Sequence, residues 1–390
     1  MAAGGSSQVR ARDADALAAL NEAAGPESQP EAKRRSLMRK GRGATLNPSV
    51  RFDACAVEAF DDGWEMPGEP EPLPPLETTL IRDSSRSAIA WNESPDIGFD
   101  RAVNPYRGCE HGCIYCYARP SHAYLGFSPG LDFETKILFK PDLARLLERE
   151  ISRPGYQVRP IALGSNTDVY QPVERRLHLT RTLLELFERT GHPFTIVTKS
   201  AGVLGDLDIL RRMAARNLTR VYISVTTLDG TLARRMEPRA AQPARRLIAM
   251  AELARNGVPV GVMAAPMIPG LNDAELERIL EAAAANGARH AQFVLLRLPH
   301  ELKAMFEDWL AQHMPERARH VLALIRETRQ GRLNDPSFHG RMRGTGPYAG
   351  LIAARFARAA KRLGLAERPA PLDCGQFVRP GSESRQLSLL

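Results

Sequence analysis

The chain has 390 residues, of which 43% are hydrophobic, enough for a substantial buried core. Its formal net charge is +8, from 53 Lys and Arg against 45 Asp and Glu, which favours a polyanionic partner. Neither a long apolar run nor a secretory signal is seen, so we expect no membrane span and a cytoplasmic location. Five cysteines, three of them clustered, exclude a disulfide framework.

The N-terminal region, residues 1–77, is rich in Ala, Gly, Pro and charge, and we expect it to be largely disordered or draped over the surface. Seven bases and no acid lie in residues 33–51, and eight acids and no base follow in residues 53–77. The two runs partly cancel each other. The triplet Arg51–Asp53 is a candidate for a short docked anchor.

The central region, residues 78–299, alternates between apolar runs of strand length and helical periodicity, which is typical of βα units and a parallel sheet. Periodicity leaves two alternatives open, a partial barrel or a flat doubly wound sheet. Either one brings the carboxyl ends of the strands together as the site. The expected strands are Gly98–Val103, Pro160–Gly164, Phe194–Lys199, Arg220–Thr226, Val258–Ala264 and His290–Leu296. The expected helices are Pro141–Ser152, Glu174–Thr190, Gly205–Asn217, Ala241–Asn256 and Asp273–Asn286.

The C-terminal region, residues 300–390, is expected to be a helical extension. Its basic tract Arg326–Arg362 has nine bases against two acids. Within it, a helix over Tyr348–Leu363 would carry a positive stripe beside an apolar face, and such a stripe could follow a phosphate backbone. The stripe consists of Arg355, Arg358 and Arg362, and the apolar face of Leu351, Ile352 and Phe356.

Three of the five cysteines, Cys109, Cys113 and Cys116, have the spacing C-x3-C-x2-C. Zinc sites built from two Cys pairs need a fourth ligand at similar spacing, whereas the other two cysteines are single and remote. An iron–sulfur cube held by three thiolates keeps one iron open for an exogenous ligand. The spacing therefore predicts a 4Fe–4S cluster, and a zinc knot completed by His111 or a distant residue is the alternative.

The string from Asn104 to Pro120, NPYRGCEHGCIYCYARP, resembles the radical S-adenosylmethionine (SAM) superfamily, and within it the spore photoproduct lyase-like branch. The resemblance implies a partial (β/α)6 barrel and a 4Fe–4S cluster whose open iron binds SAM. It further implies reductive cleavage of SAM to a 5′-deoxyadenosyl radical, which abstracts hydrogen from a substrate; nucleic acid is the first candidate. An electron donor such as flavodoxin or ferredoxin is implied as well.

The resemblance also assigns SAM contacts to strand ends. Where the superfamily often has Gly-Gly-Glu, to bind the methionyl ammonium, this chain has residues 164–168, Gly-Ser-Asn-Thr-Asp. Ser224 matches a ribose or carboxylate contact and Tyr115 the adenine side, while Lys199 is placed to pair with the SAM carboxylate. The expected cofactor-binding residues are Tyr115, Gly164, Ser165, Asn166, Asp168, Lys199 and Ser224.

Purely structural explanations compete with these assignments: an Asx turn at residues 166–168, a solvated Lys199 and a packed Tyr115. Arg235 and Glu237 also follow a strand end, but we interpret them first as charges on the face of a helix.

Spore photoproduct lyase uses a cysteine in the barrel as hydrogen donor, but this chain has no cysteine between Cys116 and Cys374. Tyr117, Tyr170 and Tyr222 are possible substitutes. Two rival functions therefore stay open. One is radical modification of a peptide or small molecule, and the other is non-enzymatic nucleic-acid binding with a structural zinc site.

Overall fold

The structure, a computed structural model, describes residues 41–52, 76–366 and 368–381. All of these residues belong to the larger of the two units into which the chain divides, Leu37–Leu390. The predictions made for residues 1–40 and 53–75 lie outside the described residues. Residues 41–52 dock on the cysteine region, and the anchor residue Arg51 forms an ion pair of 2.9 Å with Glu301.

Six parallel strands, as predicted, form most of the main sheet. They are β3 (Arg101–Val103), β6 (Ile161–Leu163), β7 (Phe194–Thr198), β8 (Thr219–Ser224), β9 (Val260–Met267) and β10 (His290–Leu295). A seventh strand, β2 (Ile89–Trp91), which was not predicted, runs antiparallel to β3. The order is β10-β9-β8-β7-β6-β3-β2, so β10 and β2 are the two edges of an open sheet. This is the partial barrel expected from the sequence.

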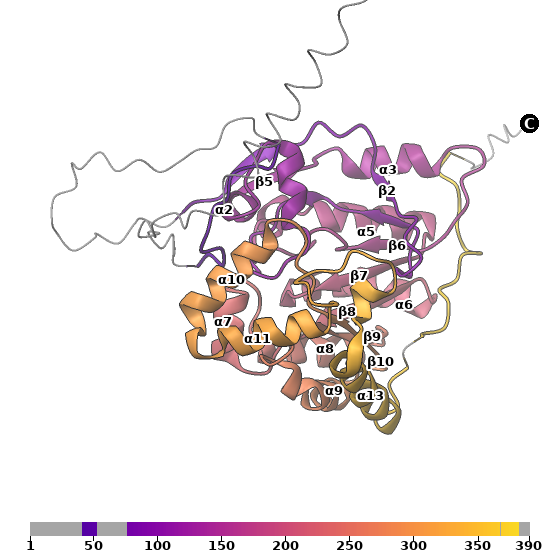
Figure 1. Cartoon of the computed structure of the whole chain (residues 1–390). Helices are drawn as coiled ribbons and strands as arrows, with labels where there is room; N and C mark the ends of the chain where they lie inside the picture. The colour runs from indigo at the N-terminus through magenta and orange to yellow at the C-terminus, as the bar shows by residue number, and fades with distance from the viewer. Residues whose placement is uncertain (1–40, 53–75, 367, 382–390) are drawn as a thin grey trace, which may run out of the picture. The chain divides into compact units, whose positions relative to one another are not determined.

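Helices connect these strands and cover the sheet (Figure 1). They are α3 (Leu143–Ile151), α4 (Glu174–Leu177), α5 (Leu179–Thr190), α6 (Leu207–Ala215), α7 (Gly230–Met236), α8 (Pro243–Arg255) and α9 (Leu276–Ala285), with short 3-10 turns at η2 (Ala201–Asp206) and η3 (Asp273–Glu275). The single helix predicted over Glu174–Thr190 is two helices, because His178 takes a left-handed conformation with φ of 51° and ends α4.

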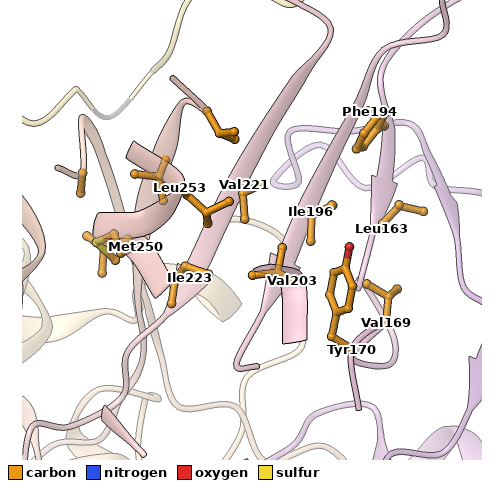
Figure 2. Packing of buried hydrophobic residues seen from close by; sticks show 14 of the residues in the cluster. Leu163, Val169, Tyr170, Phe194, Ile196, Val203, Val221, Ile223, Met250 and Leu253 are labelled. Atoms are coloured by element: carbon orange, nitrogen blue, oxygen red, sulfur yellow. The ribbon is translucent and has the colours of Figure 1, made fainter. Parts of the chain in front are cut away.

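The core lies between the sheet and its helices. Strand β8 is buried along its whole length, as expected for a parallel strand covered on both faces. Figure 2 shows Val221 and Ile223 of β8 on the side of Met250 and Leu253 of α8, and Ile196 of the neighbouring strand β7 beside Val203. No helix in the described ranges is both long and apolar enough to span a membrane.

A small second sheet, which the sequence did not predict, holds the segment around the cysteines. It consists of β1 (Thr79–Arg82), β5 (Lys136–Phe139) and β4 (Tyr106–Arg107), in the order β1-β5-β4. Strand β4 directly precedes the first cysteine. After the third cysteine come the 3-10 helix η1 (Arg119–Leu125) and the short helix α2 (Leu131–Thr135).

The C-terminal extension is helical, as predicted, with α10 (Leu302–His313), α11 (Pro315–Glu327), α12 (Gly340–Arg343) and α13 (Gly346–Arg362). Helix α10 lies beside α7 (Figure 1), where Trp309 Nε1 donates to the carbonyl of Arg235 at 3.1 Å.

Two of the three arginines in the predicted positive stripe on α13 form ion pairs with acids of α9, so the stripe carries less net charge than the sequence alone indicates. Arg355 lies 2.6 Å from Glu277 and Arg362 lies 2.5 Å from Glu281. The apolar face is also narrower than predicted, since Leu351 is exposed.

Candidate active site

The cysteine loop follows β3 and β4, and two of its glycines have conformations that other residues rarely adopt. Gly108 has φ of 84° and Gly112 has φ of 68°. A side chain at Gly108 would lie 2.8 Å from the carbonyl oxygen of Phe133, and one at Gly112 would lie 2.8 Å from Glu134 Oε2. Both glycines are therefore required for the turn and for close approach of the chain.

Side chains of the loop after β6 hold the cysteine loop from one side. The carbonyl of Gly108 accepts hydrogen bonds from Thr167 Oγ1 at 2.7 Å and from Gln171 Nε2 at 3.3 Å. Gln171 Oε1 in turn accepts from the backbone N–H of Glu110 at 2.8 Å. These hydrogen bonds position the backbone on both sides of Cys109.

A buried ion pair holds the loop from the other side. Arg119 and Glu134 are fully buried and paired, and Arg119 Nε donates to the carbonyl of Cys113 at 2.8 Å. Glu134 also accepts from the backbone N–H groups of Gly43 and Ala44, at 2.9 and 2.8 Å. Residues 41–52 are thus attached to the loop through one carboxylate.

The three cysteines are free thiols at the carboxyl end of β3. Cys109 and Cys113 are buried, and Cys116 is partly exposed. Burial raises the pKa of Cys109 well above its ordinary value and that of Cys113 to about 12. Such thiols ionise when a metal cation takes the place of the proton, so the donor set fits an iron–sulfur cluster.

Histidine 111, the alternative zinc ligand, lies inside the protein with its Nδ1 at 3.3 Å from Asp168 Oδ2. Among the described residues, no three His, Cys, Asp or Glu side chains are grouped as ligands of a single metal ion.

Asp168, a predicted SAM contact, accepts hydrogen bonds from groups of the protein itself. It accepts from Thr198 Oγ1 and from the backbone N–H of Lys199, both at 2.7 Å. Burial alone raises the pKa of this carboxyl, but His111 and these donors outweigh burial and lower the pKa to about 2. Asp168 therefore fixes the end of β7 beside the cysteine loop.

Gly164, Ser165 and Asn166 lie at the same mouth. Gly164 has φ of 86°, and a Cβ there would lie 2.2 Å from the carbonyl oxygen of Val197. The side chain of Asn104 donates to Ser165 Oγ at 3.1 Å and accepts from the backbone N–H of Asn166 at 3.1 Å. The loop after β6 is thereby joined to the segment before the first cysteine.

Tyr115 contacts a second buried ion pair. Its hydroxyl donates to Glu237, which pairs with Arg246 of α8, and lies 3.1 Å from Thr226 Oγ1. Burial raises the pKa of Glu237, but Arg246 outweighs burial and lowers it overall. The ammonium of Lys199 lies 5.7 Å from the centroid of the Tyr115 ring.

Ser224 ends β8 next to this pair. Its Oγ donates to the carbonyl of Ala265 at 3.1 Å, and its own carbonyl accepts from Arg246 at 3.0 Å. Tyr115, Lys199 and Ser224, predicted from three separate strand ends, are thus joined through the surroundings of Glu237 and Arg246.

The interpretation of Glu237 as a charge on a helix face is wrong, because it follows the last residue of α7 and turns inward to Arg246. Arg235, in contrast, is exposed and donates to the carbonyl of His313 at 3.1 Å. Sequence reasoning also missed Arg119, Glu134 and Arg246. The short distance of Arg119 from the third cysteine was an available signal, whereas Glu134 and Arg246 had none.

The three tyrosines considered as hydrogen donors differ in position. Tyr170 is buried and donates to Asp206, and Tyr222 is buried within β8. Tyr117 follows Cys116, is 48% exposed, and donates to the carbonyl of Ser165. The guanidinium of Arg297, after β10, lies 5.3 Å from the centroid of the Tyr117 ring. Only Tyr117 of the three joins the cysteine loop to the exposed mouth.

Fold and site together define an α/β protein with a three-cysteine loop at the carboxyl mouth of a partial barrel. The Radical SAM superfamily model matches residues 103–283, and the chain belongs to this superfamily. Members of the superfamily use a 4Fe–4S cluster and SAM, so the protein is an enzyme with radical SAM chemistry.

The similarity to known proteins extends beyond residues 103–283. An uncharacterized protein of Mycobacterium tuberculosis is 34% identical over 288 residues, which are 72% of this chain and 81% of the relative. A radical SAM Nalpha-GlyT isomerase of Pseudomonas phage M6 is 23% identical over 60% of this chain and 48% of its own length. Among solved structures, spore photoproduct lyase complexed with dinucleoside spore photoproduct has a TM-score of 0.56 at 17% identity. That match covers 78% of this chain and 87% of the lyase, and it shows a shared fold.

Proposed function

We propose that Cys109, Cys113 and Cys116 hold a 4Fe–4S cluster and that the protein acts on a nucleic acid. When bound, the cluster would supply an electron for reductive cleavage of SAM to a 5′-deoxyadenosyl radical, which abstracts hydrogen from the substrate. The observation that carries the cluster assignment is the loop itself. It carries three thiols, and its backbone is held by Gln171 at Glu110 on one side and by Arg119 at Cys113 on the other.

We assign the seven predicted SAM-binding residues to two sides of the SAM molecule. Tyr115, Lys199 and Ser224 surround the Glu237–Arg246 pair and form the adenine, ribose and carboxylate side. The loop of residues 164–168 forms the methionyl side. Within that loop Ser165 and Asn166 supply polar groups, Gly164 allows close approach to β7, and Asp168 acts indirectly by orienting the backbone of Lys199.

For the substrate, the supporting observation is Arg297 beside Tyr117 at the mouth. The described residues place no Asp or Glu oxygen within 4.0 Å of the Arg297 guanidinium. An arginine without a counter-ion in a partly buried mouth favours an anionic substrate. The lyase structure that shares the fold holds a dinucleoside, which agrees with this substrate class.

Tyr117 is the residue we propose as hydrogen donor in place of the absent barrel cysteine. The electron would come from a carrier such as flavodoxin or ferredoxin. A thiolate-ligated cluster of this kind suits a reducing compartment such as the cytoplasm.

The test is anaerobic reconstitution with iron and sulfide. We expect about four irons per chain, and Cys113→Ala should abolish the cluster absorbance and SAM cleavage. Cys374→Ala, a change at the remote free thiol, is the control and should keep both. A colourless protein that binds zinc and cleaves no SAM would instead establish the structural-zinc alternative.

The substrate class is tested by adding oligonucleotides, peptides or small-molecule fractions from a cell extract to the reduced enzyme with SAM. Stimulated release of 5′-deoxyadenosine by oligonucleotides alone supports the proposal. Stimulation by peptides or small molecules alone assigns the enzyme to the rival class.

A further inference from the structure

The segment between α11 and α13 links the two edges of the open sheet; it is drawn in orange to yellow in Figure 1. At one end, Arg329 donates to the carbonyl of Leu296, just after β10, at 2.7 Å. At the other, Arg341 Nε donates to Asp96, in the loop between β2 and β3, at 2.7 Å. Residues 329–343, which we call the bridging segment, therefore lie beside the lateral opening of the partial barrel.

The bridging segment is basic, with four arginines and one aspartate in residues 329–343. Arg329 is buried, yet its Nε has no hydrogen-bond partner and its other described contacts are to carbonyl oxygens. Arg297 lies close to it and contacts Met342 of the segment through Sδ at 3.5 Å. Within the described ranges no carboxylate oxygen lies within 4.0 Å of either guanidinium. Among the described residues these two guanidiniums form no ion pair, and the acids that act on them, Asp96 on Arg297 and Asp335 on Arg329, do so from beyond 4.0 Å.

Two aromatic rings, Phe338 at the surface and Tyr117 in the cysteine loop, each lie beside an arginine. Phe338 is 55% exposed, and the guanidinium of Arg341 lies 4.8 Å from its ring centroid. Burial and then the charge of Arg341 lower the pKa of Arg297, whose guanidinium lies 5.3 Å from the ring centroid of Tyr117, next to Cys116. Exposed aromatic rings beside arginines are the combination by which proteins bind single-stranded nucleic acids, through base stacking and phosphate contacts.

We propose that the bridging segment, with Arg297 and Tyr117, is a docking surface for single-stranded nucleic acid that presents an unpaired base to the mouth. This inference rests on the proposed function and names the form of its substrate. Phe338 would stack on one base, and Arg297 would pair with a phosphate. A duplex fits less well, because paired bases offer no free face to Phe338 and the only helix of the segment, α12, has four residues.

The test is fluorescence anisotropy of a labelled single-stranded oligothymidylate, and of a duplex of equal length, with the anaerobically reconstituted full chain. Phe338→Ala should weaken single-strand binding about fivefold to 150-fold, the usual worth of one stacked base. Phe52→Ala is a matched control, because Phe52 is 57% exposed and has Arg51 at 4.8 Å from its ring. The control should keep wild-type affinity, iron content and SAM cleavage.

The salt dependence of oligonucleotide affinity tests whether Arg297 contacts a phosphate. Arg297→Gln should flatten the slope of log affinity against log salt by about 0.7 for a single strand, since one phosphate contact is lost. Arg358→Gln removes an equal charge from α13 and should leave the slope unchanged. Equal affinity for duplex and single strand, or no loss in Phe338→Ala, would overturn the docking surface.

Different results would refute the docking surface and the proposed radical SAM function. Single-strand binding that responds to Phe338→Ala in a protein that cleaves no SAM would support the docking surface and refute the enzymatic proposal. SAM cleavage in a protein that binds no oligonucleotide at low salt would refute the docking surface.

Discussion

Two buried glutamate–arginine pairs lie on either side of the cysteine loop, and they hold different parts of it. Apart from each other, Glu134 and Arg119 bind backbone groups: the carbonyls of Cys113, Pro129 and Gly130, and the N–H groups of Gly43 and Ala44. The pair of Glu237 and Arg246 binds the Tyr115 hydroxyl and the carbonyl of Ser224. One pair therefore shapes the loop, and the other positions side chains that we assign to SAM.

This difference matters because a buried ion pair contributes little net stability over an apolar replacement, whereas removal of one partner costs about 3–5 kcal/mol. The role of a buried ion pair is therefore better explained by the groups that it positions than by the stability that it adds. The Glu134 pair joins the loop to residues 41–52, and the Glu237 pair joins three strand ends. Separate measurements of iron content and SAM affinity can tell the two roles apart.

The largest effect is expected for Glu134→Gln. The change leaves Arg119 buried without its counter-ion, so the free energy of unfolding should fall by about 4 kcal/mol. The carbonyl of Cys113 and the N–H groups of residues 43 and 44 lose their common support, so reconstituted iron should fall as well. Urea unfolding under anaerobic conditions and iron analysis measure the two effects.

Glu174→Gln is the matched control. Glu174 is also buried and accepts from the Tyr106 hydroxyl and the backbone N–H of Thr180, but it pairs with no arginine of the described ranges. Burial raises its pKa, so a neutral amide is a mild replacement and should cost about 1 kcal/mol or less. An equal loss in both variants would show that the ion pair has no special role.

A second prediction concerns His192, a buried histidine whose two hydrogen-bond partners, Tyr156 and the carbonyl of Pro193, are neutral. Its Nε2 accepts from the Tyr156 hydroxyl at 2.8 Å, and its Nδ1 donates to the carbonyl of Pro193 at 3.0 Å. Burial lowers its pKa to about 4. The unfolded chain binds the proton more readily, so stability is complete above about pH 6.5 and is lost as the pH falls toward 4.

The loss from His192 should reach about 2 kcal/mol between pH 7 and pH 5, measured by urea unfolding at each pH. His122, whose pKa burial also lowers to about 4, adds a similar share. His192→Phe should remove the share that His192 contributes, about 2 kcal/mol between pH 7 and pH 5. If its pH dependence matches that of the wild type, the histidine is already charged in the folded protein.

The sequence predicted the six parallel strands and the cysteine loop because both depend on local patterns: apolar runs of strand length and a fixed spacing of thiols. It missed the small sheet because β4 has only two residues and pairs with a strand about thirty positions away. Glu237 was misinterpreted for a related reason. Its partner Arg246 lies beyond the end of α7, and helical periodicity says nothing about a charge that turns inward after a helix ends.

For Glu237→Gln the effect that separates it from Glu134→Gln is a smaller one, on SAM affinity. Both changes leave a buried arginine without its counter-ion, so stability alone does not separate them. In Glu237→Gln the Tyr115 hydroxyl loses a charged acceptor, which we expect to weaken SAM binding about tenfold, or about 1.4 kcal/mol. Iron content should persist, because the contacts of Arg119 with the loop remain. Calorimetric SAM titration of both variants makes the test, and a loss of iron equal to that of Glu134→Gln would contradict the division of roles.

The smallest effect is expected for Ser224→Ala, which removes one hydroxyl from the Glu237 side and leaves both ion pairs intact. The hydroxyl proton is directed to the carbonyl of Ala265, so the oxygen can accept a hydrogen bond from a ribose hydroxyl of SAM. Its loss should weaken SAM binding by about 1 kcal/mol without change in iron content. Thr190→Val is the matched control, because Thr190 is a buried hydroxyl that donates to the carbonyl of Leu186 at 2.8 Å, on α5. Both variants should lose a similar amount of stability, but only Ser224→Ala should lose SAM affinity. Equal SAM affinity in the two would remove Ser224 from the cofactor site and leave it as the hydroxyl that ties the end of β8 to β9.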